Sequence, residues 1–303
     1  MTFTDRGVGV LLVLAAALFW SFSGVCVKSM PGVNPLLITG YRSIFTLFVM
    51  TAYYVFACGT LAQAAHTARR AFGFRRAWGS ACCYAMMLVL FISATRYTTA
   101  ANAILLQYAA PMYVALLSVP LLGEPVRPKE WLALFGCLIG IFMFFGEQLT
   151  TEGWWGNILG VLSGIACALN AVFMRSLSKI PGKGAFAPGQ SRDVSLAFPA
   201  VILGNLLTIL ICLPWMTEVA GITPYYWKIL VFMGLFQLGL PYTLFTVGIS
   251  KVGALEGVIL AMTEAVLNPV WVAFATGETP SLMACAGGTL ILVSIGAYGW
   301  LKK

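Results

Sequence analysis

The stretch from Gly253 to Ala275, GALEGVILAMTEAVLNPVWVAFA, is an apolar segment with a carboxylate at its centre. It has the length of about 20 residues that a helix needs to cross a bilayer. Glu264 lies at its midpoint, between Glu256 and Asn268. A charge at the bilayer centre costs roughly 2.5–3.5 kcal/mol unless a partner or a wet cavity receives it. Glu264 is therefore either a functional group in a solute pathway or a protonated carboxyl that only bonds a neighbouring helix.

The whole chain has the composition of an integral membrane protein. Of its 303 residues, 60% are hydrophobic and 9% are charged, whereas soluble domains carry about 25% charged residues. The net charge of +8 does not indicate a nucleic-acid partner, because the basic residues gather in alternate loops. The eight cysteines form no C-x-x-C pair and lie mostly inside apolar runs. They indicate small buried residues and neither a disulfide framework nor a metal site.

Ten apolar segments are long enough to cross the membrane, and the connections between them are short. The two longest connections, 58–75 and 178–193, are basic. The sequence thus predicts an all-α membrane protein with no soluble domain. The predicted spans are 7–27, 35–57, 76–96, 100–121, 129–147, 155–177, 194–214, 226–247, 253–275 and 281–301.

Charge placement predicts the orientation. With the N-terminus in the cytoplasm, fourteen Lys and Arg residues fall on the cytoplasmic side. Only Lys28, Arg96 and Lys228 fall on the far side, and Arg42 lies inside the second span. Because basic loops stay in the cytoplasm, both termini are predicted to be cytoplasmic. We expect a multi-pass protein of the bacterial inner (plasma) membrane, with the lipid bilayer and a small-molecule substrate as partners. A monomer is sufficient for this design, and the oligomeric state is left open.

The chain repeats itself at two constant offsets. The first and sixth spans align as GVLLVLAAALFWSFSGVCVKSM (9–30) with GNILGVLSGIACALNAVFMRSL (156–177). The fourth and ninth spans align as NAILLQYAAPMYVALLSVPLLGEP (102–125) with EGVILAMTEAVLNPVWVAFATGET (256–279). The second alignment superposes a Gly-Glu pair near the end of each span. The chain is therefore predicted to contain two related copies.

An odd number of spans in each copy decides how the copies face. Five spans per copy mean that the second copy enters the membrane upside down. The predicted architecture is ten transmembrane helices as two inverted five-helix repeats, residues 1–149 and 153–303. Inverted repeats suit alternating access around a ligand held near the midplane.

Two five-span inverted repeats, with Gly123-Glu124 aligned on Gly277-Glu278 and with Glu264 and Asn268 in the ninth span, resemble the drug/metabolite transporter superfamily in its EamA-type branch. The resemblance covers nearly the whole chain, and one departure concerns the ninth span. The branch often has proline directly after the acid, where this chain has Ala265 and places its proline at Pro269. The resemblance implies an exporter or exchanger of small organic solutes, often amino acids or related metabolites. The residues that carry it are Phe19-Trp20-Ser21, Lys28, Arg42, Asn102, Pro111, Leu122-Gly123-Glu124, Glu264, Asn268-Pro269-Val270-Trp271 and Gly277-Glu278.

Polar and aromatic side chains in several spans are the candidates for a substrate cavity. Each has a structural alternative, because it can instead bond or pack against a neighbouring helix. Glu264, Glu256 and Arg42 are the candidate proton or counter-charge residues. Arg42 is expected to pair with Glu256, to bind a ligand carboxylate, or to reach the far interface. The candidate substrate-binding residues are Trp20, Ser21, Tyr84, Asn102, Gln107, Tyr108, Asn170, Gln237, Tyr242, Glu264, Asn268 and Trp271.

Prolines and helix-end acids complete the pattern. Pro111, Pro241 and Pro269 interrupt backbone bonding within spans and mark kinks or gates. Glu124 and Glu278 lie at helix ends, where a carboxylate can accept hydrogen bonds from the N–H groups that begin the next helix. We interpret both acids as structural.

Three classes of function compete. A secondary transporter, moving amino acids or related amines with or without proton coupling, is favoured by the repeats and the polar spans. Nucleotide-type or other metabolites are the alternative cargo. An enzyme is disfavoured because the one histidine, His66, lies in a loop and no metal or phosphate motif is present. No cofactor is expected. A channel or a structural membrane protein is the third class, although a channel would need a ring or filter of polar residues.

Overall fold

A computed structural model describes residues 5–149, 152–180, 194–219, 221–277 and 281–301. Within these ranges every regular element is a helix, so the prediction of an all-α membrane protein is confirmed. Each of the ten predicted spans contains helix. Nine helices in the described part are long and apolar enough to cross a bilayer. The segment predicted at 194–214 holds a shorter apolar helix, Ala197–Cys212.

The five predicted spans of the first half correspond to helices within α1 to α8, and the five of the second half correspond to helices within α9 to α15. The first half comprises α1 (Asp5–Trp20), α2 (Ser23–Lys28), α3 (Pro35–Cys58), α4 (Leu61–Phe72), α5 (Arg75–Tyr97), α6 (Ala100–Gln107), α7 (Ala110–Leu122) and α8 (Pro128–Phe145). The second half comprises α9 (Trp154–Ser178), α10 (Ala197–Cys212), α11 (Pro224–Phe232), the π-helix η3 (Met233–Gly239), α12 (Leu240–Lys251), α13 (Ala254–Ala261), α14 (Thr263–Thr276) and α15 (Leu282–Leu301).

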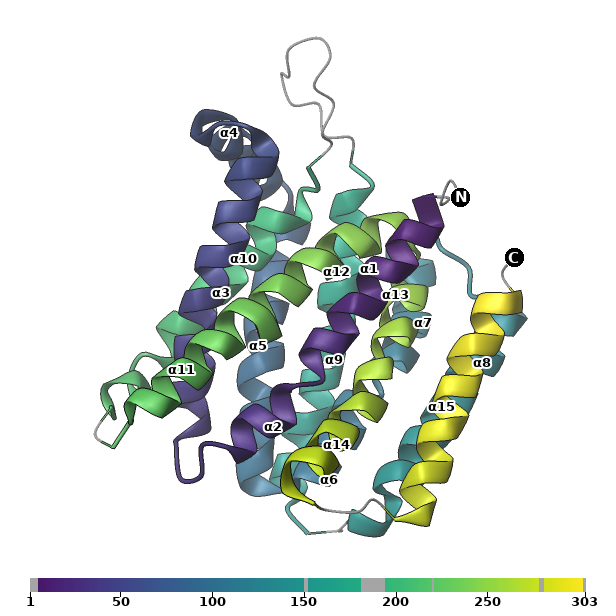
Figure 1. Cartoon of the computed structure of the whole chain (residues 1–303). Helices are drawn as coiled ribbons and strands as arrows, with labels where there is room; N and C mark the ends of the chain where they lie inside the picture. Colours follow the sequence, from purple (N-terminus) through teal and green to yellow (C-terminus); the bar gives the residue numbers. More distant parts are fainter. Residues whose placement is uncertain (1–4, 150–151, 181–193, 220, 278–280, 302–303) are drawn as a thin grey trace.

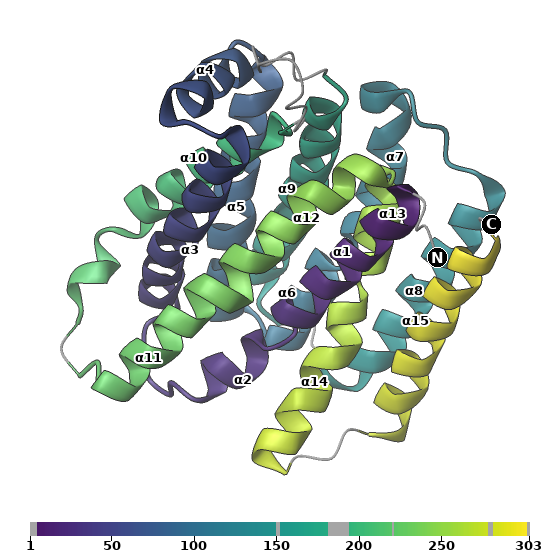
Figure 2. The same cartoon turned by 45° about the horizontal axis from the view of Figure 1, so that its top comes forward.

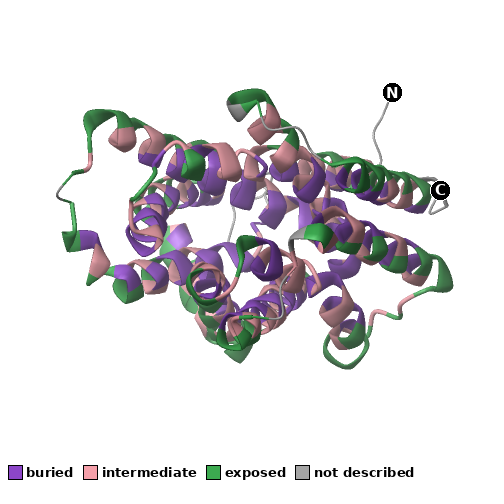
Figure 3. Cartoon of the chain, turned by 90° about the horizontal axis from the view of Figure 1, so that it is seen from below, coloured by how far each residue is buried: buried purple, intermediate pink, exposed green. Residues whose placement is uncertain are grey.

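Helices of the two halves pack against one another throughout the bundle. α5 packs on α9 and α10, α1 packs on α12, α3 packs on α10 and η3, and α8 pairs with α15. In Figure 1 the pair α6–α7 runs upward while α13–α14 runs downward, as inverted copies require. In the tilted view of Figure 2, α1 of the first half lies beside α12 of the second half. Seen along the bundle, buried residues fill its centre and exposed residues line its outside (Figure 3).

Local sequence accounts for where several helices begin. The side chains of Asn34, Thr60, Thr99 and Thr223 each accept a hydrogen bond from a backbone N–H in the first turn of the helix that follows. Such caps satisfy N–H groups that have no partner inside the helix. Pro35 and Pro224 occupy the first helical positions, where a missing N–H does no harm.

One helix was not predicted. The connection 58–75 contains α4, which begins on the Thr60 cap and buries Ala64 and Ala71. α4 packs against α3 and α10, and Tyr54 of α3 donates a hydrogen bond to the Ala64 carbonyl at 2.9 Å. The helix is amphipathic and basic, so the search for apolar spans passed over it.

Glycines let α9 approach the fourth span closely. A Cβ at Gly156 would lie 2.5 Å from the Thr98 backbone nitrogen, and one at Gly164 would lie 2.7 Å from the Leu106 carbonyl oxygen. Real Cβ contacts are never that short. Together with Gly160, these residues form one small-residue face of α9, which permits backbone-to-backbone packing.

Four spans are interrupted near the middle of the bundle. α1 and α2 are separated at Ser21, α6 and α7 at Tyr108, and α13 and α14 at Met262, while η3 interrupts the eighth span. At the offset that aligns the fourth and ninth spans, Tyr108 falls on Met262, so both copies break at the same place. Pro111 explains the first of these breaks because it supplies no N–H to the carbonyl of the preceding turn. The ninth span breaks without a proline there, since Ala265 occupies the aligned position.

A proline also accompanies the π-helix that interrupts the eighth span. Pro241, the second residue of α12, has no N–H for the Gln237 carbonyl four residues earlier. Thr46 of α3 donates a hydrogen bond to the Gly234 carbonyl at 3.0 Å, which fixes the π-helix against α3. π-Turns within α-helices occur frequently at functional sites, and this one carries Gln237.

Candidate functional site

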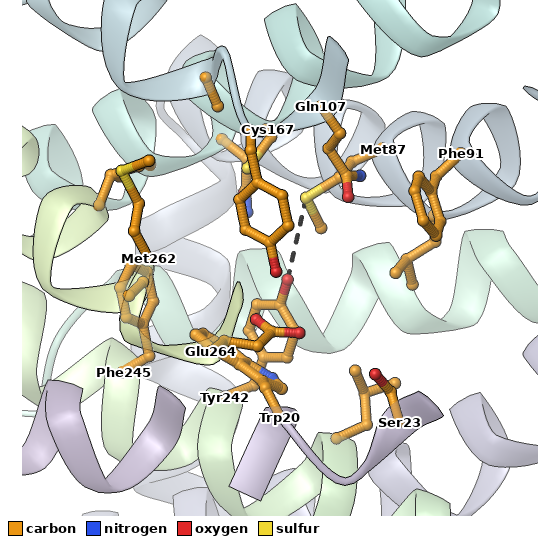
Figure 4. Close-up of a pocket in the computed structure, with 18 of the residues that line it drawn as sticks. Trp20, Ser23, Met87, Phe91, Gln107, Cys167, Tyr242, Phe245, Met262 and Glu264 are labelled. Carbon is orange, nitrogen blue, oxygen red and sulfur yellow. Dashed lines mark hydrogen bonds between the residues drawn. The ribbon is translucent and has the colours of Figure 1, made fainter. Parts of the chain in front are cut away.

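A cavity of about 200 Å³ lies where the interrupted helices meet. Both halves of the chain contribute to its wall, and Figure 4 shows the side chains that point into it. The lining residues are Trp20, Ser23, Arg42, Met87, Leu88, Phe91, Gln107, Tyr108, Ala110, Pro111, Cys167, Asn170, Ala171, Gln237, Leu238, Tyr242, Phe245, Val258, Ala261, Met262 and Glu264.

Seven of the twelve predicted binding residues line this cavity. They come from six different helices of the chain, so the fold gathers side chains that lie far apart in sequence. The seven residues are Trp20, Gln107, Tyr108, Asn170, Gln237, Tyr242 and Glu264. The predicted counter-charge residue Arg42 lines the cavity with them.

The other five predicted binding residues do not line the cavity, and each is held by a hydrogen bond. Trp271 donates its indole N–H to the Ser21 hydroxyl at 2.8 Å. Asn268 donates to the Ser23 hydroxyl at 3.0 Å, which makes it a support for a lining residue. The remaining two are Tyr84, whose hydroxyl is 3.2 Å from Asn205 Oδ1, and Asn102, whose amide donates to Asn157 Oδ1 at 3.0 Å.

The expected pair between Arg42 and Glu256 is wrong. Glu256 is 2% exposed and forms an ion pair with Arg6 at 2.7 Å. This contact joins the start of α1 to the first turn of α13, at the end of the bundle and away from the cavity. Glu256 lies eight residues before Glu264, about 12 Å along a helix, so a role at one does not imply a role at the other.

Arg42 and Glu264 are a base and an acid that line the same cavity without pairing. Arg42 is only 9% exposed. Within the described residues neither side chain forms a hydrogen bond or an ion pair with the other, and Arg42 Nε is buried without a partner. A buried charge without a close partner destabilises a fold by several kcal/mol, so a polar or anionic group that reached the Arg42 guanidinium would be stabilising.

Three buried polar atoms of the lining residues point to the same conclusion. Trp20 Nε1, Arg42 Nε and Gln237 Oε1 have no hydrogen-bond partner among the residues that the structure describes. The amide nitrogen of Gln237 is used, because it donates to the Trp20 carbonyl at 3.1 Å. Buried polar atoms in proteins are nearly always bonded, so these free donors and this free acceptor are available to a ligand.

An aromatic wall faces the charged groups. The Trp20 ring meets Tyr242 edge-on at 5.0 Å and Phe245 at 5.3 Å between centroids. Tyr84 packs behind Tyr242 at 4.8 Å. The Tyr242 hydroxyl points to Met87 Sδ at 3.9 Å (Figure 4). A mostly apolar cavity with a few polar groups is the usual form of a small-molecule site.

Sequence reasoning missed several lining residues, among them Ser23, Cys167, Met87 and Phe91. The repeat alignment contained a signal for two of them. At its offset Trp20 falls on Cys167 and Ser23 falls on Asn170, and all four line the cavity. Apolar residues such as Met87 and Phe91 carried no signal, because every span is rich in similar side chains.

A polar cluster ties the halves together at the end of the bundle where α7 and α9 end and α13 begins. The Glu124 carboxylate lies 2.9 Å from both Arg175 Nε and Lys179 Nζ. Its second oxygen accepts from the backbone N–H of Ala254 at 3.4 Å. Arg175 also donates to the Ser250 carbonyl at 2.7 Å. The cluster thus joins the fourth, sixth, eighth and ninth spans.

This arrangement corrects the interpretation of Glu124 as a cap for the next helix. The next helix, α8, is capped by Glu130, which accepts from the Arg127 N–H at 2.8 Å. Burial alone would raise the pKa of Glu124, but the hydrogen bonds from Lys179 and Arg175 outweigh it and lower the pKa below the ordinary value. Its predicted counterpart, Glu278, lies outside the described residues.

In the described ranges, no group of three or more His, Cys, Asp and Glu side chains is arranged to hold a metal ion.

The fold, with its apolar spans around a central cavity, indicates a multi-pass membrane protein, and comparison with known families identifies it as a transporter. The EamA-like transporter family model matches residues 7–146 and 154–298. The chain belongs to the EamA-like transporter family.

Two relatives agree with this assignment, and a solved structure shares the fold. An uncharacterized transporter of Archaeoglobus fulgidus is 30% identical over 205 residues, covering 68% of this chain and 69% of its own. The pseudopaline exporter CntI of Pseudomonas aeruginosa is 26% identical over 223 residues, 72% of each chain. A crystal structure described only as that of a protein matches with a TM-score of 0.76 at 18% identity and covers 98% of both chains. That last likeness concerns the fold alone.

Proposed function

We propose that this transporter is a secondary active carrier that exports or exchanges small organic metabolites, with amino acids or related amines as its cargo. One observation carries the proposal: a basic side chain, Arg42, and an acidic one, Glu264, line one cavity without pairing, beside the breaks of helices from both halves. The cavity of about 200 Å³ is smaller than the about 300–1,000 Å³ of drug-sized sites, which favours a small metabolite. A relative named as an exporter supports the direction.

We propose that the site works by alternating access. The helix breaks at Ser21, Tyr108 and Met262 surround the cavity, so each span can bend there while its outer half stays packed. The Glu124 cluster and the Arg6–Glu256 pair hold the same end of the bundle together. These contacts would separate when that end opens. Inverted repeats allow the two ends to open in turn around a fixed site.

Glu264 has two candidate roles in this cycle. As a proton site it would bind a proton from one side and release it when the solute enters. As a counter-charge it would bind the ammonium group of the solute directly. Both roles use the placement of Glu264 in the first turn of α14 beside the cavity.

The membrane arrangement follows from charge. We propose that both termini and the connections 58–75 and 178–193 are cytoplasmic, in a bacterial inner membrane, because fourteen basic residues lie on that side. The proposed repeats are residues 1–149 and 153–303. Residues 181–193 lie outside the described part of the chain, so labelling must decide the side of that connection.

Counterflow in proteoliposomes tests the proposed function. Purified protein would be reconstituted with a trapped unlabelled solute, and uptake of the same labelled solute would be followed for amino acids, amines and nucleosides. A carrier gives saturable uptake that depends on the trapped solute. Uptake that neither saturates nor needs trapped solute, together with ionic conductance, would identify a channel, and nucleoside exchange alone would replace the amino-acid proposal by the nucleotide-type alternative.

A further inference from the structure

We infer that Arg42 is an oxyanion-binding subsite of the cavity, and that the transported solute carries a carboxylate there in addition to a cationic group near Glu264. This inference rests on the proposed function and narrows it from amino acids or amines to zwitterions. It begins from the position of Arg42, which lies about two turns into α3, on its buried face, and lines the cavity.

The Arg42 guanidinium has N–H donors that form no hydrogen bond within the described residues. An Arg side chain carries five N–H donors in a planar fork that matches a carboxylate. Within the described part of the chain no acceptor is hydrogen-bonded to any of the five, and Nε is fully buried without a partner. Glu264 is the one carboxylic acid among the described residues that line the cavity. It does not pair with Arg42, so the guanidinium is available to an anionic group of the solute.

The backbone around Arg42 is fixed. A Cβ at Gly234 would meet the Arg42 carbonyl oxygen at 2.7 Å, so α3 and the π-helix are in direct backbone contact. The Thr46 hydrogen bond to the Gly234 carbonyl holds the next turn of α3 against the same segment. The π-helix also carries Gln237, whose free Oε1 accepts but does not donate. A site on rigid elements keeps its geometry before the ligand arrives.

The polar groups of the cavity therefore form two sets, hydrogen-bond donors and hydrogen-bond acceptors. Arg42 Nε and Trp20 Nε1 are free donors, whereas Gln237 Oε1 and the Glu264 carboxylate are acceptors. A solute with only an amine would satisfy the acceptors and leave Arg42 buried without a partner. A solute with a carboxylate and an ammonium group satisfies both sets.

The test compares solutes that differ only at the carboxylate. Binding to the purified protein would be measured by thermal shift and by displacement for each of the twenty proteinogenic L-amino acids. Each amino acid that binds would then be compared with its own carboxamide and its decarboxylated amine. We expect the carboxamide and the amine to bind about 10–100-fold more weakly, the range of one or two charge-assisted hydrogen bonds.

Arg42→Gln should abolish the discrimination, so that acid and carboxamide bind equally, and Arg42→Lys should keep part of it. Arg96→Gln is the matched control, because Arg96 is a basic residue hydrogen-bonded to Asn34 outside the cavity. If Arg42→Gln does not fold, the comparison of solutes on the wild-type protein still decides the question. Equal wild-type affinity for acid, carboxamide and amine would overturn the Arg42 subsite and leave an amine carrier. The absence of binding and of counterflow for every amino acid and amine would overturn the proposed function as well.

Discussion

Replacing Glu124 by glutamine removes the negative charge from the cluster that joins the two halves at one end of the bundle. One oxygen of Glu124 lies 2.9 Å from Arg175 Nε and from Lys179 Nζ. Glutamine has nearly the same shape, and its amide oxygen can keep one neutral hydrogen bond. The substitution therefore isolates the charge of Glu124 from its packing.

The exposure of the three side chains sets the magnitude. Glu124 and Arg175 are 26% and 18% exposed, so their contact falls toward the lower part of the roughly 1.5–3 kcal/mol of hydrogen bonds to charged groups. Lys179 is 40% exposed, and its pair contributes about 0.2–1 kcal/mol. After the hydrogen bond that glutamine keeps, the free energy of unfolding should fall by about 1–2 kcal/mol. At about 2–4 °C per kcal/mol, Tm should fall by about 2–8 °C.

The loss should depend on pH in one direction. The pKa of Glu124 is lowered in the folded protein, so its stabilising effect is complete above the ordinary Glu pKa of about 4.3 and disappears as pH falls through the lowered value. Thermal unfolding in detergent would be followed from pH 7 to pH 3. We expect a clear difference between wild type and Glu124→Gln at pH 7 that decreases as pH falls below about 4.3. Glu147→Gln, at an exposed acid, is the control. Equal Tm values at pH 7, or a difference that does not decrease between pH 5 and pH 3, would refute the reasoning.

Three further experiments test the packing of α9, the Arg6–Glu256 ion pair and the membrane topology. In a denaturation assay, Gly156→Ala should destabilise the fold by about 1–3 kcal/mol, because the new Cβ would clash with the backbone. Gly296→Ala is the control and should be neutral or stabilising, because a Cβ there would have nothing within 4 Å. Equal effects of the two substitutions would contradict the close packing of α9. Arg6→Gln removes the cation from a carboxylate that is 2% exposed, but Arg6 itself is 33% exposed. The free energy of unfolding should therefore fall by about 1–3 kcal/mol in the same assay, and no measurable change would argue against that pair. In a cysteine-free background, a cysteine at Gln190 should resist an impermeant thiol reagent added to intact cells and one at Glu218 should react; the reverse pattern would invert the topology.

The membrane architecture could be read from sequence because the signals are long and periodic. Ten apolar segments, each about the length of a bilayer crossing, contain all the spans, and two constant offsets align the copies. The interruption of the fourth and ninth spans at aligned positions was not predicted. A break at Tyr108 could be expected from Pro111, but the break at Met262 has no proline beside it. Packing against the other half must maintain it.

Side-chain partners were harder to predict than elements. Arg42 and Glu256 have opposite charges, which suggested a pair, but the two residues lie at different depths in the bundle. The depth of a residue cannot be assigned from sequence before the tilt and the breaks of its helix are known. Glu124 was interpreted as a local cap, because sequence shows which N–H groups follow it and not that Arg175 and Ala254 approach from the other half. The π-helix was also missed, since a single extra residue in a turn leaves the apolar pattern almost unchanged.

Transport by Glu264→Gln in proteoliposomes, with and without a pH gradient, tests the central claim most directly, namely that the cavity is the transport site. Glutamine keeps the shape of Glu264 and removes its titration. As a proton site, Glu264 predicts that the variant loses accumulation driven by the pH gradient while exchange of one labelled solute molecule for another persists. As a counter-charge, it predicts that both activities fall and that affinity weakens. Glu147→Gln, at an exposed acid outside the cavity, should behave as wild type. Wild-type accumulation and exchange in a normally folded Glu264→Gln would contradict the account.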